Sequence, residues 1–165
     1  MIHARGGMYI FLKALHVITM FAAVTLLMGE ALFLCLATWR RDVRALSALH
    51  RMAPNLSLTA VGAALFLVGV VLGFILAATG HLNFLAGWLI AAYVLVALIL
   101  LNNVSPFVQR LRPLVREAVE AEAGRRPVEE VVRSMDRVRT GLFVAVAINT
   151  VIFVSVIADM ILKPF

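Results

Sequence analysis

The chain has 165 residues, of which 63% are hydrophobic and 15% are charged, and its formal net charge is +6. Soluble domains are roughly 45–50% apolar and about 25% charged, so this composition excludes a soluble globular enzyme and indicates a single integral membrane domain over residues 1–165. The only cysteine, Cys35, excludes an internal disulfide and a CxxCH attachment of c-type haem. Any haem would therefore be bound non-covalently.

Stretches without charged residues locate four predicted membrane-spanning helices. Residues 52–109 contain no Asp, Glu, Lys or Arg. At a rise of about 1.5 Å per residue this run is too long for one crossing and long enough for two. The turn-forming residues at 78–83 divide it into spans at about 55–78 and 84–104, and further apolar runs lie at about 8–38 and 141–162. The predicted fold is therefore all-α, a four-helix transmembrane bundle in the cell membrane.

Arginine is concentrated in two of the predicted loops. The first loop carries Arg40, Arg41, Arg44 and Arg51, the third carries eight more arginines between residues 110 and 139, and the second carries no Lys or Arg. The positive-inside rule places loops one and three in the cytoplasm and both termini outside. Anionic headgroups of the lipid bilayer account for this charge, so nucleic acid is not expected as a partner.

The third loop, residues 105–140, has helical periodicity on both sides of Gly124. Pro127 followed by Glu129 and Glu130 is typical of a helix start, because proline suits the first turn and acidic groups favour the positive end of the helix dipole. We therefore expect a cytoplasmic helical hairpin between the third and fourth spans, broken at Gly124. Its apolar stripes would pack on each other, on the bilayer surface or on a partner.

Ionisable side chains within a span are costly in lipid and suggest functional sites. One predicted layer lies near the outer surface, just inside the interfacial Lys13 and Lys163, and it contains His16, Met20, His81, Trp88 and Asp159. Neutral imidazole ligates haem iron, copper and zinc, and a helix bundle can place two such rings on opposite faces of a porphyrin. His16 and His81 are therefore predicted as metal ligands, namely the axial ligands of a haem b, and Met20 and Trp88 as further cofactor-binding residues. In the alternative interpretation, His16 hydrogen-bonds Asp159 and His81 is an interfacial loop residue.

Glu30 defines a second, inner layer. It lies 14 residues beyond His16, which corresponds to about 21 Å along a helix. Its plausible partners are amides: Asn55, Asn102, Asn103 and Asn149. This layer predicts either a proton or cation relay or a structural network, and the network is favoured because one carboxylate does not make a pathway. Gly62, Gly69 and Gly73 in the second span permit close contact between helices.

Short segments resemble a known family. Residues 8–18 (MYIFLKALHVI) and 162–165 (LKPF) resemble the two ends of the HemJ-type protoporphyrinogen oxidases, and residues 87–89 (GWL) resemble their third-helix motif. Those proteins are four-helix membrane proteins that bind haem b, so the resemblance implies that His16 ligates haem. Ile90 and Ala92 stand where that motif has a histidine and a lysine, and the family's second histidine has no counterpart near residues 37–38. These departures disfavour oxidase activity.

Over its full length the chain is similar to uncharacterised integral membrane proteins related to HemJ and to the CopD membrane domain. The function predicted is thus a haem b-binding membrane protein with a redox or electron-transfer role. Two other function classes stay open. One is a non-catalytic accessory subunit, in contact with other membrane subunits or with further copies of itself, and the other is a small metal-handling or transport protein using His16, Met20 and Asp159.

Overall fold

The structure, a computed structural model, describes residues 2–52, 58–103 and 111–162, and it is all-helical there, as predicted. Asn55 and Lys163 lie outside the described residues, as does the side chain of Asn103. Six helices are seen in the described ranges: α1 (Ile2–Trp39), α2 (Val43–Met52), α3 (Leu58–Thr79), α4 (Gly87–Asn103), α6 (Leu111–Glu122) and α7 (Val128–Leu162).

Three of the described helices are long and apolar enough to cross a membrane. Their apolar portions are Gly7–Trp39 in α1, Thr59–Thr79 in α3 and Val128–Asp159 in α7. The remaining predicted span, at about 84–104, corresponds to α4, which is apolar but has only 17 residues. At about 1.5 Å per residue it is about 25 Å long, slightly less than the roughly 30 Å hydrocarbon core of a bilayer.

Two helices, α2 and α7, differ from the sequence prediction. Helix α2 lies within the first loop, for which no helix was predicted. The second helix of the expected hairpin is not a separate element, because α7 runs without a break from Val128 to Leu162 and includes the predicted last span. No proline lies between these two residues, so the amphipathic first half passes directly into the apolar second half.

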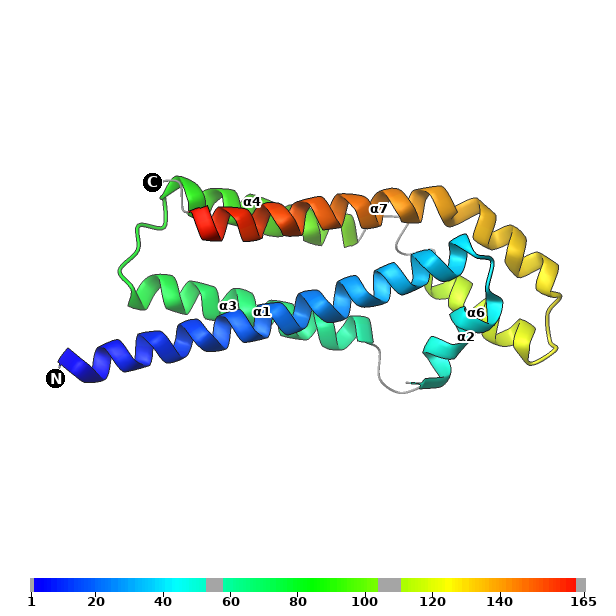
Figure 1. Ribbon diagram of the computed structural model, residues 1–165, viewed down its shortest axis with the longest axis horizontal. Coiled ribbons are helices and arrows are strands. Elements are labelled where there is room, and N and C mark those ends of the chain that lie inside the picture. The colour runs from blue at the N-terminus through cyan, green and yellow to red at the C-terminus, as the bar shows by residue number, and fades with distance from the viewer. Residues whose placement is uncertain (1, 53–57, 104–110, 163–165) are drawn as a thin grey trace.

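The four long helices form two layers (Figure 1). Helices α1 and α3 pack together in one layer, α4 and α7 pack together in the other, and α1 also contacts α7. In the described residues, no Cα atom of α3 comes within 8 Å of a Cα atom of α4. A buried cluster that includes Ala23, Phe66, Ile99 and Phe153 joins all four helices near their middle.

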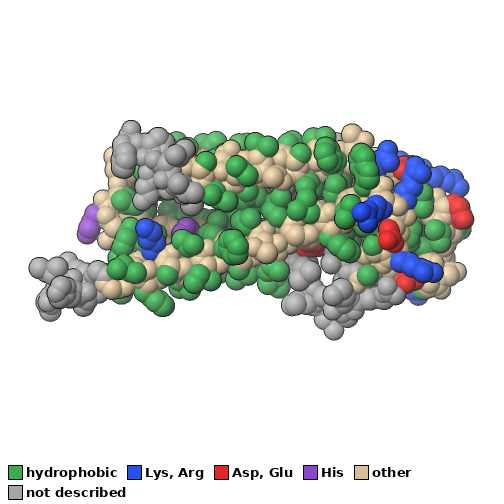
Figure 2. Space-filling model, in the orientation of Figure 1, with side chains coloured by type: hydrophobic (Ala, Val, Ile, Leu, Met, Phe, Trp, Pro, Cys, Tyr) green, Lys and Arg blue, Asp and Glu red, His purple; other side chains and the backbone are tan. Residues whose placement is uncertain are grey.

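Helices α2 and α6 cover one end of the two layers, where they contact each other, and α6 also packs on the first part of α7. This part has a core of its own, in which Leu46, Ala118, Val131 and Met135 are fully or almost fully buried. Charged side chains gather on it in Figure 2. We call residues 40–52 and 111–140 the arginine end, and the opposite end, which carries His16, His81 and Asp159, the histidine end.

Large apolar side chains cover the outside of the long helices between these two ends (Figure 2). Phe21 is 74% exposed, and Leu67, Val151 and Val154 are also more than half exposed. Soluble monomers rarely expose apolar surface on this scale, so the pattern is that of helices that face lipid.

Candidate functional site

Helices α1 and α3 pack in a regular seam, in which three glycines of α3 and one in the turn after it face larger side chains on α1. The pairs are Gly62 with Leu27, Gly69 with Met20, Gly73 with His16 and Gly80 with Tyr9. The two residue numbers of each pair have the same sum, as expected for antiparallel helices in one fixed register. A Cβ atom added at Gly62 would lie 2.8 Å from Leu27 Cγ, and one added at Gly80 would lie 2.9 Å from Tyr9 Cε2. The glycines therefore allow a close approach that any larger residue would disturb.

His16 is held by this seam. Its Nδ1 lies 2.8 Å from the carbonyl oxygen of Gly69, and its Cε1 would lie 3.1 Å from a Cβ atom at Gly73. Because a carbonyl oxygen only accepts hydrogen bonds, Nδ1 carries the proton and donates. In the neutral ring, Nε2 then keeps its lone pair. Histidines that ligate metals have this arrangement, in which the other ring nitrogen donates to a backbone carbonyl.

His81 lies in the turn after α3 and is exposed, with a positive φ of 52°. It follows Gly80, which packs against Tyr9, whereas His16 packs against Gly73. His81 thus lies about two helical turns beyond His16 toward the end of the molecule. None of the described contacts joins the two histidines, and no group of three or more His, Cys, Asp or Glu side chains within the described ranges could hold a metal ion.

Met20 and Trp88, the other two predicted cofactor-binding residues, also lie toward the histidine end. The Met20 sulfur is turned into the seam against Gly69, so it lies on the same face of α1 as His16. Trp88 is half-buried in the first turn of α4.

Asp159 and Tyr93 are polar groups that face inward without a partner. The Asp159 Oδ2 atom and the Tyr93 hydroxyl are buried and have no hydrogen bond. The alternative in which His16 hydrogen-bonds Asp159 is thus not what the structure shows, since the described bond of His16 goes to Gly69. Sequence reasoning missed Tyr93, because a tyrosine near a membrane surface is common and nothing in the sequence indicated that its hydroxyl would be buried.

The depths of these two groups agree. Asn102 of α4 bonds Asn149 of α7 and thereby fixes the register of the two helices. Tyr93 lies nine residues from Asn102 and Asp159 ten residues from Asn149, both toward the histidine end, which corresponds to about 14 and 15 Å. The Tyr93 ring also stacks on Phe74, next to Gly73, at a centroid distance of 5.3 Å. Tyr93 therefore lies within about one turn of the depth of His16.

The predicted inner layer consists of two separate pairs. Thr59 donates a hydrogen bond of 2.8 Å to Glu30, which joins α1 to α3. Asn102 donates bonds of 2.9 Å to Asn149 and 3.1 Å to the carbonyl oxygen of Ala145, which join α4 to α7. The described partner of Glu30 is thus Thr59, whereas two of the amides expected beside it bond each other. Each pair ties together the two helices of one layer.

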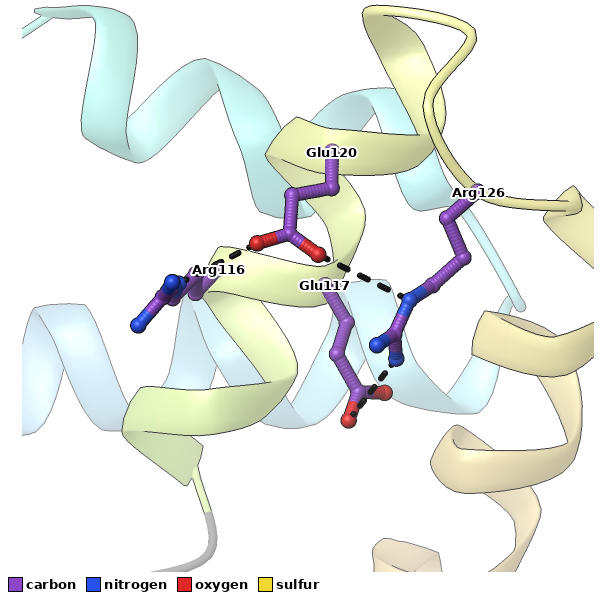
Figure 3. Close-up of polar contacts among 4 residues, drawn as sticks. All are labelled: Arg116, Glu117, Glu120 and Arg126. Carbon is purple, nitrogen blue, oxygen red and sulfur yellow. Dashed lines mark hydrogen bonds and ion pairs between the residues drawn. The ribbon is translucent and has the colours of Figure 1, made fainter.

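Ion pairs at the arginine end hold the turn after α6 to that helix and the turn after α1 to α7. In Figure 3, Arg126 reaches both Glu117, at 3.2 Å, and Glu120, at 3.6 Å, and Arg116 also pairs with Glu120. The first two contacts hold the turn after α6, where Gly124 has a φ of +69°. Arg41 in the turn after α1 makes a bidentate pair with Asp136 of α7, with both distances 3.1 Å.

An aromatic group marks the level at which the arginine end begins. The Arg139 guanidinium lies 4.8 Å from the centroid of the Trp39 ring, and this ring also packs against Phe143. Tryptophan and arginine in contact are typical of a membrane–water interface, where the ring lies at headgroup level.

Long apolar helices with lipid-type surfaces, polar pairs between neighbouring helices and a charged helical end together define an integral membrane protein. The comparison with known families agrees: residues 10–164 match the family described as predicted integral membrane protein (DUF2269), and the chain belongs to this family. A search of the curated proteins and of the solved structures found no match for the chain. The relation to HemJ-type oxidases and CopD stays a prediction.

Proposed function

We propose that the protein binds haem b in the membrane and has a redox or electron-transfer role, with His16 as an axial ligand. The observation that carries the proposal is the hydrogen bond from His16 Nδ1 to the Gly69 carbonyl oxygen. It leaves Nε2 as the nitrogen available to iron and holds the ring in one orientation. His16 thus suits haem iron because of the chemistry of its Nε2 atom, and this argument does not depend on the resemblance to HemJ.

The chain supplies the position of this ligand. Because His16 lies against Gly73 and bonds Gly69, a change in the distance between α1 and α3 would move the imidazole. A bound haem would supply a reversible one-electron carrier, and its axial ligands and apolar surroundings would tune its potential. His81 is the proposed second ligand, which requires the exposed turn after α3 to fold inward on binding.

The proposed topology has four crossings, with α4 as the shortest. Both termini face the outside, and the arginine end, including the hairpin of α6 and the first part of α7, faces the cytoplasm. The charge distribution supports this orientation, because the described histidine end has few basic side chains.

An absorption spectrum of the purified, full-length protein tests the haem proposal. We expect a Soret band that shifts on reduction with dithionite, that is lost in His16→Ala, and that changes from a low-spin to a high-spin form in His81→Ala. Gly29→Ala is the matched control on α1, since a Cβ atom there would meet nothing within 4 Å. A folded preparation without a Soret band after haem reconstitution, or an unchanged spectrum in His16→Ala, would refute the proposal.

A second candidate function is that of an accessory subunit, and the arginine end favours it. Six arginines there, within the described side chains, make no ion pair: Arg40, Arg44, Arg125, Arg133, Arg137 and Arg139. Two of these, with Arg41, border an open pocket between the turn after α1 and the turn after α6. A partner subunit with acidic side chains would fit this surface. Purification in a mild detergent should then recover a stoichiometric partner, and recovery of the chain alone would contradict this role.

A further inference from the structure

One arginine at the border of the arginine end is held in place without an anionic partner. The Arg139 guanidinium lies 4.8 Å from the centroid of the Trp39 ring, and within the described residues it makes no hydrogen bond or ion pair. A cation–π contact restrains a charged group but does not neutralise it. Arg139 therefore keeps its positive charge and its N–H donors for a further acceptor.

Arg139 lies where α1 and α7 both change from charged to apolar composition. Residues 31–39 of α1 and 140–158 of α7 carry no charged side chain. Trp39 and Phe143 pack against each other at this border, with their ring centroids 6.0 Å apart. Figure 2 shows the charged side chains beginning where the apolar surface ends. The guanidinium of Arg139 thus lies at the headgroup level of the membrane.

The carboxylates that lie near this level are already in use. Asp136, about one turn before Arg139 on α7, forms the bidentate pair with Arg41. Asp42, in the turn after α1, accepts a hydrogen bond of 2.9 Å from the backbone N–H of Ala45. Among the described side chains, Arg139 therefore has no counter-ion.

Two exposed apolar stripes run from this border toward the middle of the molecule. Their members repeat at helical spacing and are at least half exposed: Leu32, Leu36 and Trp39 on α1, and Phe143, Val151 and Val154 on α7. Because Trp39 and Phe143 are in contact, the two stripes begin side by side. Hydrocarbon chains suit such a surface, whereas an acidic segment of a protein does not.

We propose that Arg139 and Trp39 bind one phospholipid with a net negative headgroup, such as phosphatidylglycerol. The guanidinium would donate charge-assisted hydrogen bonds to the phosphate, and the two stripes would receive the acyl chains. Arg40 directly follows Trp39, is exposed and makes no ion pair, so it adds a second positive charge at this level. The ammonium group of phosphatidylcholine would be repelled by these two cations. The site does not involve the haem.

Fluorescence quenching by brominated lipids tests the site, because the chain has two tryptophans, Trp39 at the site and Trp88 toward the histidine end. Trp88→Phe leaves Trp39 as the only fluorophore of this kind, and Trp39→Phe leaves Trp88. The full-length protein is reconstituted in vesicles of phosphatidylcholine and phosphatidylglycerol at one fixed ratio, with bromine on the chains of either lipid, so that the surface charge is the same. Corrected for lipid abundance, quenching of Trp39 should be about fivefold stronger by phosphatidylglycerol, and quenching of Trp88 should show no preference.

Variants assign this preference to Arg139. Arg139→Gln should reduce it to less than about twofold, because a neutral amide does not pair with the phosphate. Arg133→Gln is the matched control and should keep the preference. Arg133 is also exposed on α7 and makes no ion pair, but it lies six residues, or about 9 Å, farther from the apolar region.

Three results would overturn the inference. Equal quenching of Trp39 by the two lipids would show that no preference exists, and a preference unchanged in Arg139→Gln would show that Arg139 does not cause it. An equal loss in Arg139→Gln and Arg133→Gln, or the same preference at Trp88, would show a general effect of charge in place of a site.

Thermal unfolding in detergent repeats the test with both tryptophans present. At about ten times its dissociation constant, phosphatidylglycerol should raise the Tm of the wild type and of Arg133→Gln by roughly 3–5 °C, and it should not raise that of Arg139→Gln. An equal shift of the wild-type Tm by phosphatidylcholine would overturn the inference. Each measurement compares two lipids on the same protein sample, so its result does not depend on bound haem, which the Soret band tests separately.

Discussion

Replacing Gly62 by alanine tests the seam between α1 and α3 on which the position of His16 depends. An added Cβ atom would lie 2.8 Å from Leu27 Cγ and 2.9 Å from Leu27 Cδ2, whereas ordinary contacts begin at 3.4 Å. The Leu27 side chain must therefore retreat by about 0.6 Å. Since Cγ is the branch point and Leu27 packs against the central cluster, the whole side chain or the helix has to move.

The expected magnitude follows from two opposing effects. Overpacking of this kind costs about 1–3 kcal/mol, and alanine gains roughly 0.5–1 kcal/mol over glycine within a helix. The net loss in the free energy of unfolding should thus be about 1 kcal/mol, which corresponds to a fall in Tm of roughly 2–4 °C for a chain of this length. Circular dichroism of the protein in a mild detergent, recorded against temperature, measures it.

Two further variants make this test specific. Gly29→Ala, where the added atom meets nothing within 4 Å, should leave the Tm unchanged or raise it. The double variant with Leu27→Ala and Gly62→Ala should lose less free energy of unfolding than the sum of the losses in the two single variants. The reason is that the smaller side chain at position 27 makes room for the new Cβ atom. Equal Tm values for Gly62→Ala and Gly29→Ala would refute the close packing of the seam.

Two other predictions concern polar contacts. Asn102→Leu and Asn149→Leu should each lower the free energy of unfolding by about 0.5–1.5 kcal/mol, because the two amides bond each other between α4 and α7. A double-mutant cycle should show a coupling energy of similar size, and additive effects would contradict the bond. Arg41→Gln should lower the free energy of unfolding by only about 0.2–1 kcal/mol, and by less at high salt, since the Arg41 and Asp136 side chains are 55% and 38% exposed. A larger loss of stability that salt does not reduce would show that Arg41 has another role.

Much of the secondary structure could be predicted because lipid imposes simple demands on a sequence. A long run without charge must be helical where it meets hydrocarbon, and the turn formers near Gly80 and the helix start after Pro127 have local causes. Helix α2 escaped prediction because it carries polar and basic residues among its apolar ones, and its amphipathic face matters only when α6 packs on it. The continuity of α7 was missed because a change from charged to apolar composition resembles a loop boundary.

Depth along a helix can be predicted from sequence, but the choice of neighbouring helix cannot. Glu30, Asn102 and Asn149 were expected in one layer of the membrane, and whether they meet depends on which helices are adjacent. Since α1 pairs with α3 and α4 with α7, Glu30 bonds Thr59 and the two amides bond each other. The seam could have been found in the sequence, because the large residues of α1 and the glycines of α3 have the same spacing read in opposite directions.

The intramembrane polar groups differ in how they are used. Glu30 and Asn102 are paired within one layer, so their hydrogen bonds hold that layer together. The hydroxyls of Thr38 and Tyr93 and the Oδ2 atom of Asp159 are buried without a hydrogen bond, and they lie toward both ends of the long helices. Because an unpaired polar group in lipid lowers stability, these three groups are the ones that stability does not explain. His16 differs from them, since its bond to Gly69 holds the ring in one orientation while Nε2 keeps its lone pair.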